Sequence, residues 1–315
     1  MNHTLEQLIR DLYCSATQVL PENFRTWALG QLLKVIDFDA AFWGTGQVEP
    51  GSAHYIAHFD LDNQYANRLR ETLAINPIRD AILNNLGQPV AMDDVFPDEQ
   101  FFQSELYERL FKPYGIQRIL GSGHLDKRSG LHTLLSIYRK DKEHRFTVDE
   151  REIMHRMTYH LVAAASYAFF LHLELKNPQN NHSAAALCDQ QGFYFEVQST
   201  FLDLMEQQFP DNKDSRLPFD ISSQEQCAHN LVIKSEPMGE LRYVTIRPAN
   251  PLDNLTEREQ EVVHWITKGL SFKEVGRQLH VAPSTVSNHL YRVYAKLGVS
   301  SRTELAKLAG EQADS

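Results

Sequence analysis

Residues 255–309 constrain the fold of this chain more than any other stretch, because they carry the start signals of four short helices. Three hydroxyl residues are each followed three positions later by a glutamate. This is the spacing of a capping box, in which the hydroxyl accepts the N3 amide proton and the glutamate returns to the cap amide. The pairs are Thr256 with Glu259, Ser271 with Glu274, and Ser301 with Glu304. Pro283 suits the first position of the remaining helix, because the amide hydrogen that it lacks would be unpaired there.

The apolar residues of this stretch recur at helical spacing, which predicts one small shared core. They are Val262, Val263, Ile266, Val275, Leu279, Val286, Leu290, Val293 and Leu297. Gly269 and Gly298 follow two of the apolar runs, where a left-handed residue ends a helix without a steric penalty. With the apolar stripe buried, the third helix turns a polar face outward that is wide enough to enter the major groove of DNA. That face consists of Ser284, Ser287, Asn288, Tyr291, Arg292 and Lys296.

The motifs LTERE, GLSFKEVGRQL, TVSNH and KLGVSSRTEL closely resemble the LuxR-type helix-turn-helix domain. The resemblance implies that the second and third helices form the helix-turn-helix, that the domain binds double-stranded DNA and that the last helix pairs two subunits. The family's base-reading positions fall on Ser287, Asn288 and Tyr291, which are neutral here. The chain departs from the family at Ala282, where a capping serine is usual, and at Ser287, where a basic residue is usual. Specificity is therefore expected to depend on hydroxyl and amide groups rather than on arginine–guanine pairs.

Pattern and resemblance together predict a set of DNA contacts and a set of pairing residues. The predicted DNA contacts are Ser284, Thr285, Ser287, Asn288, Tyr291, Arg292, Lys296, Lys273, Arg277 and Arg302. In the last helix, Leu305, Leu308 and Ala309 are expected to form an apolar strip through which two copies pair as a homodimer. Residues 252–313 contain eight basic and seven acidic residues, whereas the whole chain contains 31 and 41. The strongly acidic remainder would repel DNA, so a single DNA-binding surface is expected.

The rest of the composition is that of a packed globular protein. A length of 315 residues allows two or three domains, and a hydrophobic content of 42% is ordinary for such a protein. Cys14, Cys188 and Cys227 are isolated and lack CxxC spacing, which predicts neither a disulfide framework nor a zinc site. The start of the chain lacks an export leader, and the apolar run 161–173 is shorter than the roughly 20 residues of a membrane-spanning helix. We therefore expect a cytoplasmic protein with no cofactor, no metal and no membrane association.

Residues 1–178 are expected to form an α/β sensor-like domain. Two helical runs precede the strand-like segments FDAAFWGTG, SAHYIAHFD and HTLLSIYRK, and a further helical stretch is inserted among these strands. Thr147 and Glu150 form another capping box, which predicts one long helix over about 148–175. Strands on both sides of inserted helices suggest a single sheet with helices packed upon it. This order resembles GAF and PAS-like sensor domains, including the autoinducer-binding domain that precedes this helix-turn-helix in quorum-sensing regulators.

The resemblance to the autoinducer-binding domain implies a ligand pocket near Tyr65, Asn76 and Met92. The family places an aspartate before proline to hold the ligand amide, where this chain has Asn76 before Pro77. It places a tryptophan where this chain has Met92, and Tyr65 is the nearest candidate for an aromatic wall. An amide thus replaces a carboxylate acceptor, and a flexible thioether replaces a flat ring. We expect a small-molecule ligand of unknown identity rather than an acyl-homoserine lactone.

The polar segment NPQNNHS marks the first predicted boundary. Residues 183–248 contain an apolar strand, a turn at Gly192, a second strand, a helix and a late alternating strand, which resembles a reduced PAS-like unit. A proline-rich break at 248–251 then predicts a short stiff linker before a domain at 252–313. The predicted fold class is therefore α+β, with an α/β sensor-like domain, a smaller PAS-like segment and a C-terminal all-α four-helix domain.

Catalytic patterns fail on spacing, so no enzyme activity is predicted. His54 and His58 lack the glutamate of HExxH, and His155 and His160 are five residues apart, which separates them on a helix. The GSGH motif at 121–124 lacks the lysine and hydroxyl of a phosphate-binding loop.

The chain is interpreted as a dimeric LuxR-type transcriptional regulator under the control of its sensor-like region. The alternative is a ligand-independent regulator whose N-terminal domains dock a protein partner. A closed aromatic-lined cavity favours sensing, and an exposed apolar groove favours docking.

Overall fold

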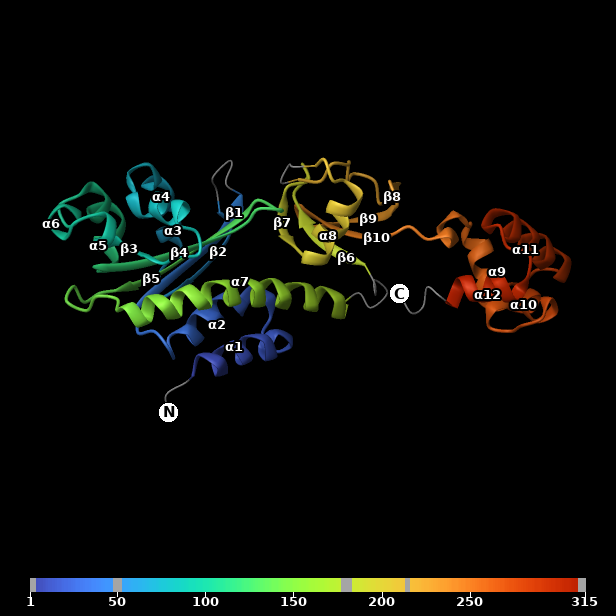
Figure 1. The fold of residues 1–315 in the computed structure, drawn as a ribbon, viewed down its shortest axis with the longest axis horizontal. Helices are drawn as coiled ribbons and strands as arrows, with labels where there is room; N and C mark the ends of the chain where they lie inside the picture. The colour runs from blue at the N-terminus through green and yellow to red at the C-terminus, as the bar shows by residue number, and fades with distance from the viewer. Residues whose placement is uncertain (1–3, 48–52, 177–182, 213–215, 311–315) are drawn as a thin grey trace. The chain divides into compact units, whose positions relative to one another are not determined.

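The computed structural model describes residues 4–47, 53–176, 183–212 and 216–310. The chain divides into two compact units, Met1–Gln226 with Ile233–Ile246, and Cys227–Val232 with Arg247–Ser315. The first unit contains one β-sheet and most of a second, and the second unit contains the C-terminal helices together with short ends of strands from the second sheet (Figure 1).

The first sheet has five strands in the order β2-β1-β5-β4-β3, and its neighbouring strands are antiparallel. The strands are β1 (Ala40–Gln47), β2 (Ala53–Phe59), β3 (Val90–Ala91), β4 (Arg118–Asp126) and β5 (Leu131–Arg139). The last strand, β5, lies between β1 and β4, so the hairpin of β4 and β5 inserts beside the hairpin of β1 and β2. The helical segment between β2 and β3 therefore has to cross one face of the sheet.

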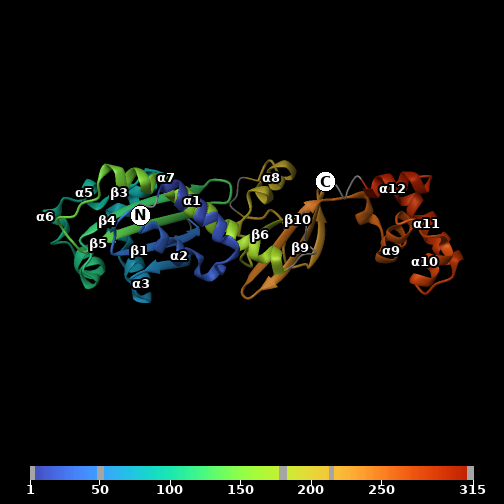
Figure 2. The same cartoon turned by 90° about the horizontal axis from the view of Figure 1, so that it is seen from below.

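Helices cover both faces of this sheet (Figures 1 and 2). One face packs against α1 (Leu5–Cys14), α2 (Pro21–Leu32) and α7 (Val148–Lys176). The other face packs against α3 (Asn63–Glu71), α4 (Pro77–Asn84), α5 (Met92–Val95) and α6 (Asp98–Phe101). Short helical turns at Ser15–Thr17, Leu73–Ile75, Tyr107–Phe111 and Lys112–Tyr114 join these elements.

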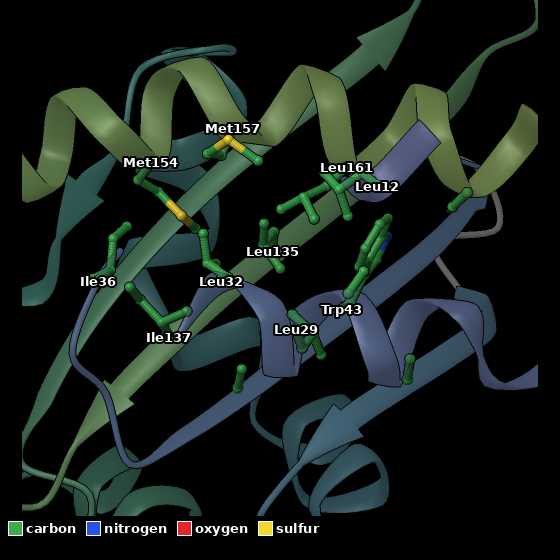
Figure 3. Packing of buried hydrophobic residues seen from close by; sticks show 14 of the residues in the cluster. Leu12, Leu29, Leu32, Ile36, Trp43, Leu135, Ile137, Met154, Met157 and Leu161 are labelled. Carbon is green, nitrogen blue, oxygen red and sulfur yellow. The ribbon is translucent and has the colours of Figure 1, made fainter. Parts of the chain in front are cut away.

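The alternation of side chains along β1 divides the hydrophobic interior into two clusters. Ala41 and Trp43 belong to the cluster beneath α1, α2 and α7, whereas Ala40 and Phe42 belong to the cluster on the opposite face. Successive residues of a strand point to opposite faces, so a run of apolar residues predicts burial on both sides. Figure 3 shows the first cluster, in which Trp43 packs between the helices and the sheet.

The long helix α7 begins at the predicted position and serves both sheets. The Thr147 and Glu150 capping box is present: the Glu150 N–H donates to the Thr147 hydroxyl (3.2 Å), and the Thr147 N–H donates to the Glu150 carboxylate (2.8 Å). Leu161 is buried against the first sheet, and Phe170 is buried against Ala185 of the second. The apolar run is thus an interior segment. Among the described residues, no helix combines the length and the apolar character needed to cross a bilayer.

The second sheet repeats the strand order of the first. Its order is β7-β6-β10-β9-β8, with β6 (Ala184–Cys188), β7 (Tyr194–Val197), β8 (Glu225–Ala228), β9 (Leu231–Met238) and β10 (Leu241–Pro248). In each sheet the first strand pairs with the second and with the last. The helix α8 (Ser199–Gln208) follows β7, and Gly192 supplies the left-handed turn (φ +87°) before that strand. This arrangement matches the predicted order and adds β8 and β9, which the sequence pattern did not predict.

The GSGH motif has a packing role within β4. A Cβ on Gly121 would lie 2.3 Å from Cδ1 of Ile82, and a Cβ on Gly123 would lie 2.7 Å from Cγ2 of the same side chain. The two glycines therefore let α4 approach the sheet closely. A glycine inside a strand often marks such a close contact.

The C-terminal helices are α9 (Glu257–Thr267), α10 (Phe272–Gln278), α11 (Pro283–Leu297) and α12 (Arg302–Gly310), preceded by a short turn at Pro251–Asn254. The predicted α+β class, with helices packed on a single N-terminal sheet and a four-helix C-terminal domain, is confirmed. Most of the predicted boundary segment NPQNNHS lies outside the described residues. The ranges 1–178, 183–248 and 252–313 stay predictions.

Candidate nucleic-acid interface and sensor cavity

The four C-terminal helices share one core, as their apolar spacing predicts. Its fully buried members are Leu255, Val262, Val263, Ile266, Val275, Val286, Leu290, Val293 and Leu305. The capping boxes at Thr256 and Ser271 are both formed. The third prediction is only half right: the Glu304 N–H donates to Ser301, but the Glu304 carboxylate accepts from the N–H of Ser300 (2.8 Å). The caps therefore specify where α9, α10 and α12 begin.

The turn between α10 and α11 depends on Gly276. A Cβ on this buried residue would lie 2.7 Å from the carbonyl oxygen of Val281, and the Gly276 carbonyl itself accepts from the Val281 N–H (2.9 Å). His280 takes the left-handed conformation (φ +55°) that reverses the chain. Gly276 was not among the predicted turn residues, although a glycine inside a short helix is a recognisable sign of close backbone packing. It fixes the approach of the two helices of the helix-turn-helix.

The exposed face of α11 consists of the polar residues predicted for it. Ser284, Ser287, Asn288, Tyr291 and Arg292 are all exposed, and the Tyr291 residue is 75% exposed. Thr285 is only half-buried and lies toward the edge of this face. Lys273 and Arg277 are exposed on α10, beside the turn. A helix that presents a row of hydroxyl, amide and guanidinium groups can donate to and accept from base edges.

Lys296 has an intramolecular partner that the sequence did not reveal. Its ammonium lies 2.6 Å from the carboxylate of Glu259, whose side chain is only 4% exposed. The hydrogen bond from Lys296 holds the pKa of Glu259 below its usual range. This ion pair joins the start of α9 to the end of α11, so Lys296 stabilises the domain. We therefore do not propose it as a DNA contact.

Arg302 is also engaged within the domain. Its guanidinium donates to the carbonyl oxygen of Ile266 (2.8 Å) in the last turn of α9 and to that of Leu270 (2.5 Å) in the loop that follows. A cation at this end of a helix satisfies carbonyl groups that have no partner in the helix. Arg302 therefore caps α9 and is likewise left out of the proposed DNA contacts.

The expectation that Leu305 lies on an exposed pairing strip is wrong. Leu305 is 0% exposed and belongs to the core of its own domain. The reason is that a domain of this size needs an apolar residue from α12 to close its core over α9. Leu308 and Ala309 are half-buried and Ala306 is exposed, so these three remain available to a second subunit.

The three predicted ligand residues are buried among aromatic and apolar side chains. Tyr65 and Met92 are members of the cluster beneath α3–α6, and the Tyr65 hydroxyl donates to Tyr138 (2.7 Å). Asn76 is 4% exposed, and its Oδ1 has no hydrogen-bond partner among the described residues. None of the three lines the cavity that the structure contains on this face of the sheet. They support the packing of α3, α4 and α5.

That cavity lies between α3, α4 and strands β1, β2 and β5. It has a volume of about 90 Å³. Its lining consists of Phe42, Gly44, Gly46, Gln47, Ile56, Ala66, Leu69, Arg70, Leu73, Arg79, Leu83, His132 and Leu134. Burial lowers the pKa of His132. Its lining is mostly apolar and includes two arginines, but its volume is below the roughly 300–1,000 Å³ of typical small-molecule sites, so only a very small amphipathic ligand fits it as it stands. Gly44 and Gly46, alternating on one strand face, were the pattern that could have indicated it.

Histidines that sequence analysis interpreted as structural have neighbours that account for them. His54 Nε2 lies 3.1 Å from the carbonyl oxygen of Phe195, and His58 Nε2 lies 3.1 Å from Oδ1 of Asn63. Within the described ranges, no group of three or more His, Cys, Asp or Glu side chains could hold a metal ion.

Comparisons with known proteins concern mainly the C-terminal helices. Residues 253–309 match the family model described as "Bacterial regulatory proteins, luxR family". The C-terminal domain is therefore a LuxR-type helix-turn-helix domain, as its motifs indicated.

Two curated relatives match limited stretches of the chain. An HTH-type transcriptional regulator of Mycobacterium bovis is 44% identical over 66 residues, which is 21% of this chain and 8% of that protein. The nitrate/nitrite response regulator protein homolog of Haemophilus influenzae is 38% identical over 85 residues, which is 27% of this chain and 41% of that protein. The chain thus spans less than half the length of each. Among solved structures, Escherichia coli SdiA aligns over 98% of this chain and 97% of its own at 12% identity, with a TM-score of 0.40.

Proposed function

We propose that this protein is a transcriptional regulator that binds duplex DNA through α11. The observation that carries the proposal is the row of exposed polar side chains on α11, presented by a domain of the LuxR family. The helix is held against α10 by the close turn at Gly276, which is the arrangement in which a second helix enters the major groove. Because duplex DNA is the partner, we expect the protein to act in the cytoplasm.

The residues of this surface divide into those that position the helix and those that read bases. Lys273 and Arg277 on α10, together with Arg292, are exposed cations suited to phosphate contacts. Asn288 can form two hydrogen bonds to adenine, and Ser287 can bond to several bases. Positioning contacts contribute affinity on all sequences alike, whereas base contacts contribute choice of sequence.

Binding of the purified protein to a randomised duplex library tests the proposal. Selected sequences should share a common site, and affinity for that site should fall steeply as salt rises, because phosphate contacts release counterions. As a control, Arg10→Ala removes an exposed arginine from α1 and should leave both the affinity for the selected site and its salt dependence unchanged. Failure to select any sequence, together with salt-independent binding, would show that the surface does not contact DNA.

We propose further that two copies pair through α12. Leu308 and Ala309 keep part of their apolar surface uncovered by their own domain. A pair of domains related by a two-fold axis reads an inverted repeat with half-sites about one helical turn apart. Leu308→Glu should reduce the stoichiometry on such a repeat from two copies to one, as measured by mass photometry. Thr303→Glu, at an exposed position of the same helix, is the control. Two copies bound by Leu308→Glu would exclude this pairing surface.

We also propose that the region around the first sheet controls DNA binding through a small molecule held in the cavity near α3 and α4. Mass spectrometry of the purified protein should find a co-purified amphipathic molecule. Ala66→Trp should exclude it by filling the cavity, whereas Gln64→Trp, at an exposed position of the same helix, should not. Acyl-homoserine lactones should leave thermal stability and DNA affinity unchanged, because no carboxylate among the described residues lines this cavity to accept a hydrogen bond from their amide. A lactone-dependent shift in either measurement would overturn this part of the proposal.

A further inference from the structure

A second cavity, of about 350 Å³, lies on the opposite face of the first sheet, where α7 and strand β7 of the second sheet also meet it. Its polar lining includes Arg25 on α2, Trp43 and Thr45 on β1, Thr133 on β5, Ser166 on α7 and Glu196 on β7. His124 and Asp126 on β4, and Lys127 and Arg128 in the turn that follows, line another part of its wall. An occupant of this cavity would contact both sheets.

Arg25 is held rigidly at the wall of this cavity. The residue is only 6% exposed, and its Nη1 donates to the hydroxyl of Thr45 (3.1 Å). Its Nη2 forms an ion pair with Glu196, and the guanidinium stacks over the ring of Tyr55 at 3.8 Å. The Thr45 hydroxyl lies 3.0 Å from that of Thr133. A buried guanidinium fixed on several sides is preorganised to bind a carboxylate.

Trp43 adds a donor that has no acceptor. The residue is 1% exposed, and its indole Nε1–H has no hydrogen-bond partner among the described residues. A buried donor without an acceptor is destabilising, and such groups are uncommon in proteins. Trp43 lines the cavity beside Arg25, so an acceptor group of a bound molecule would satisfy this buried N–H if it displaced the side chains that cover it.

We propose that this cavity binds a free α-amino acid or a zwitterion of similar size. The ligand carboxylate accepts from Arg25 and from the Trp43 Nε1–H, and the ligand ammonium donates to Glu196. The buried ion pair of Arg25 and Glu196 is neutral overall, so a ligand with a single charge would face one member of the pair with a like charge. A zwitterion presents an opposite charge to each.

The surroundings of Glu196 support this assignment. Burial raises the pKa of its carboxyl group, and the charge of Arg25 acts in the opposite direction. A carboxylate that has lost hydration gains more from a second cationic partner than an exposed one does. The site needs neither DNA nor the cavity near α3 and α4, so it can be tested separately from the proposed function.

The experiment records the indole N–H signals of the full-length protein by NMR while common L-amino acids are added singly at millimolar concentration. The chain has three tryptophans, and Trp43→Phe assigns the signal of interest. At least one amino acid should move the Trp43 signal saturably. The matched carboxylate without the amino group and the matched amine without the carboxylate should bind about tenfold more weakly or worse.

Two substitutions distinguish the proposed contacts. Arg25→Met should abolish the shift, and Glu196→Gln should weaken amino-acid binding about tenfold without weakening the deaminated analogue. Arg70→Met, at the cavity near α3 and α4, is the control. It should change neither the shift of the Trp43 signal nor the affinity for the amino acid. If Arg25→Met fails to fold, the Glu196→Gln comparison decides alone. No saturable shift with any amino acid, or equal affinity for the deaminated analogue, would overturn the proposal.

Discussion

Lys296 and Arg292 lie one turn apart on α11, and the structure assigns them different roles that two substitutions can separate. Lys296 is bonded to the buried carboxylate of Glu259, whereas Arg292 is exposed on the face proposed to meet DNA. We expect Lys296→Met to destabilise the C-terminal domain and to leave the salt dependence of DNA binding unchanged. Arg292→Met should do the reverse.

The magnitude follows from the surroundings of Glu259. Its carboxylate keeps a hydrogen bond from the Thr256 N–H (2.8 Å) but loses the charge-assisted bond from Lys296. Such a bond contributes about 1.5–3 kcal/mol, and the partial exposure of Lys296 places the loss near the middle of this range, at about 2 kcal/mol. A loss of that size corresponds to roughly 8–16 °C in the melting temperature of a domain of about 60 residues.

Hydrogen–deuterium exchange of peptides within residues 257–305, measured in the full-length protein, provides the assay. Lys296→Met should accelerate exchange in α9 and α11 by about 30-fold, which is 2 kcal/mol expressed as an equilibrium constant. Arg292→Met should leave exchange unchanged and reduce the slope of log K against log salt by about 0.9. Unchanged exchange in Lys296→Met together with a reduced salt slope would refute the structural role of this lysine.

Three further outcomes are expected. Asn288→Ala should cost about 1–3 kcal/mol on the preferred site and relax selection at particular base pairs, and an equal loss on every library sequence would exclude base reading. Gly276→Ala should destabilise the domain by about 1–2 kcal/mol, because the new Cβ would lie 2.7 Å from the carbonyl oxygen of Val281; unchanged chemical denaturation would contradict this. Lys296 lowers the pKa of Glu259 in the folded state. The stabilisation that this ion pair gives to the fold should therefore be complete above about pH 4.3, the pKa of a glutamate in the unfolded chain, and should be lost as the pH falls through the pKa of Glu259 in the folded protein. Acid unfolding of Lys296→Met should accordingly lack this contribution.

The sequence by itself was sufficient to predict those features that depend on residues only a few positions apart in the chain. The boxes at Thr256, Ser271 and Thr147 start helices where the spacing predicts, because both partners of each box lie within one turn. The polar face of α11 follows from helical periodicity once one stripe is apolar. The fold class and the DNA-binding domain were therefore predictable.

Contacts between distant residues were decided by the tertiary structure alone. Lys296 and Arg302 carry the same charge as a DNA-contacting residue, and nothing local reveals that Glu259 and the end of α9 engage them. Leu305 looks like a surface leucine until α12 is packed on α9. The cavity at Arg25 is lined by side chains from elements that are far apart in the chain. Periodicity determines which face of a helix is polar, but only packing determines which of its groups remain free to bind another molecule.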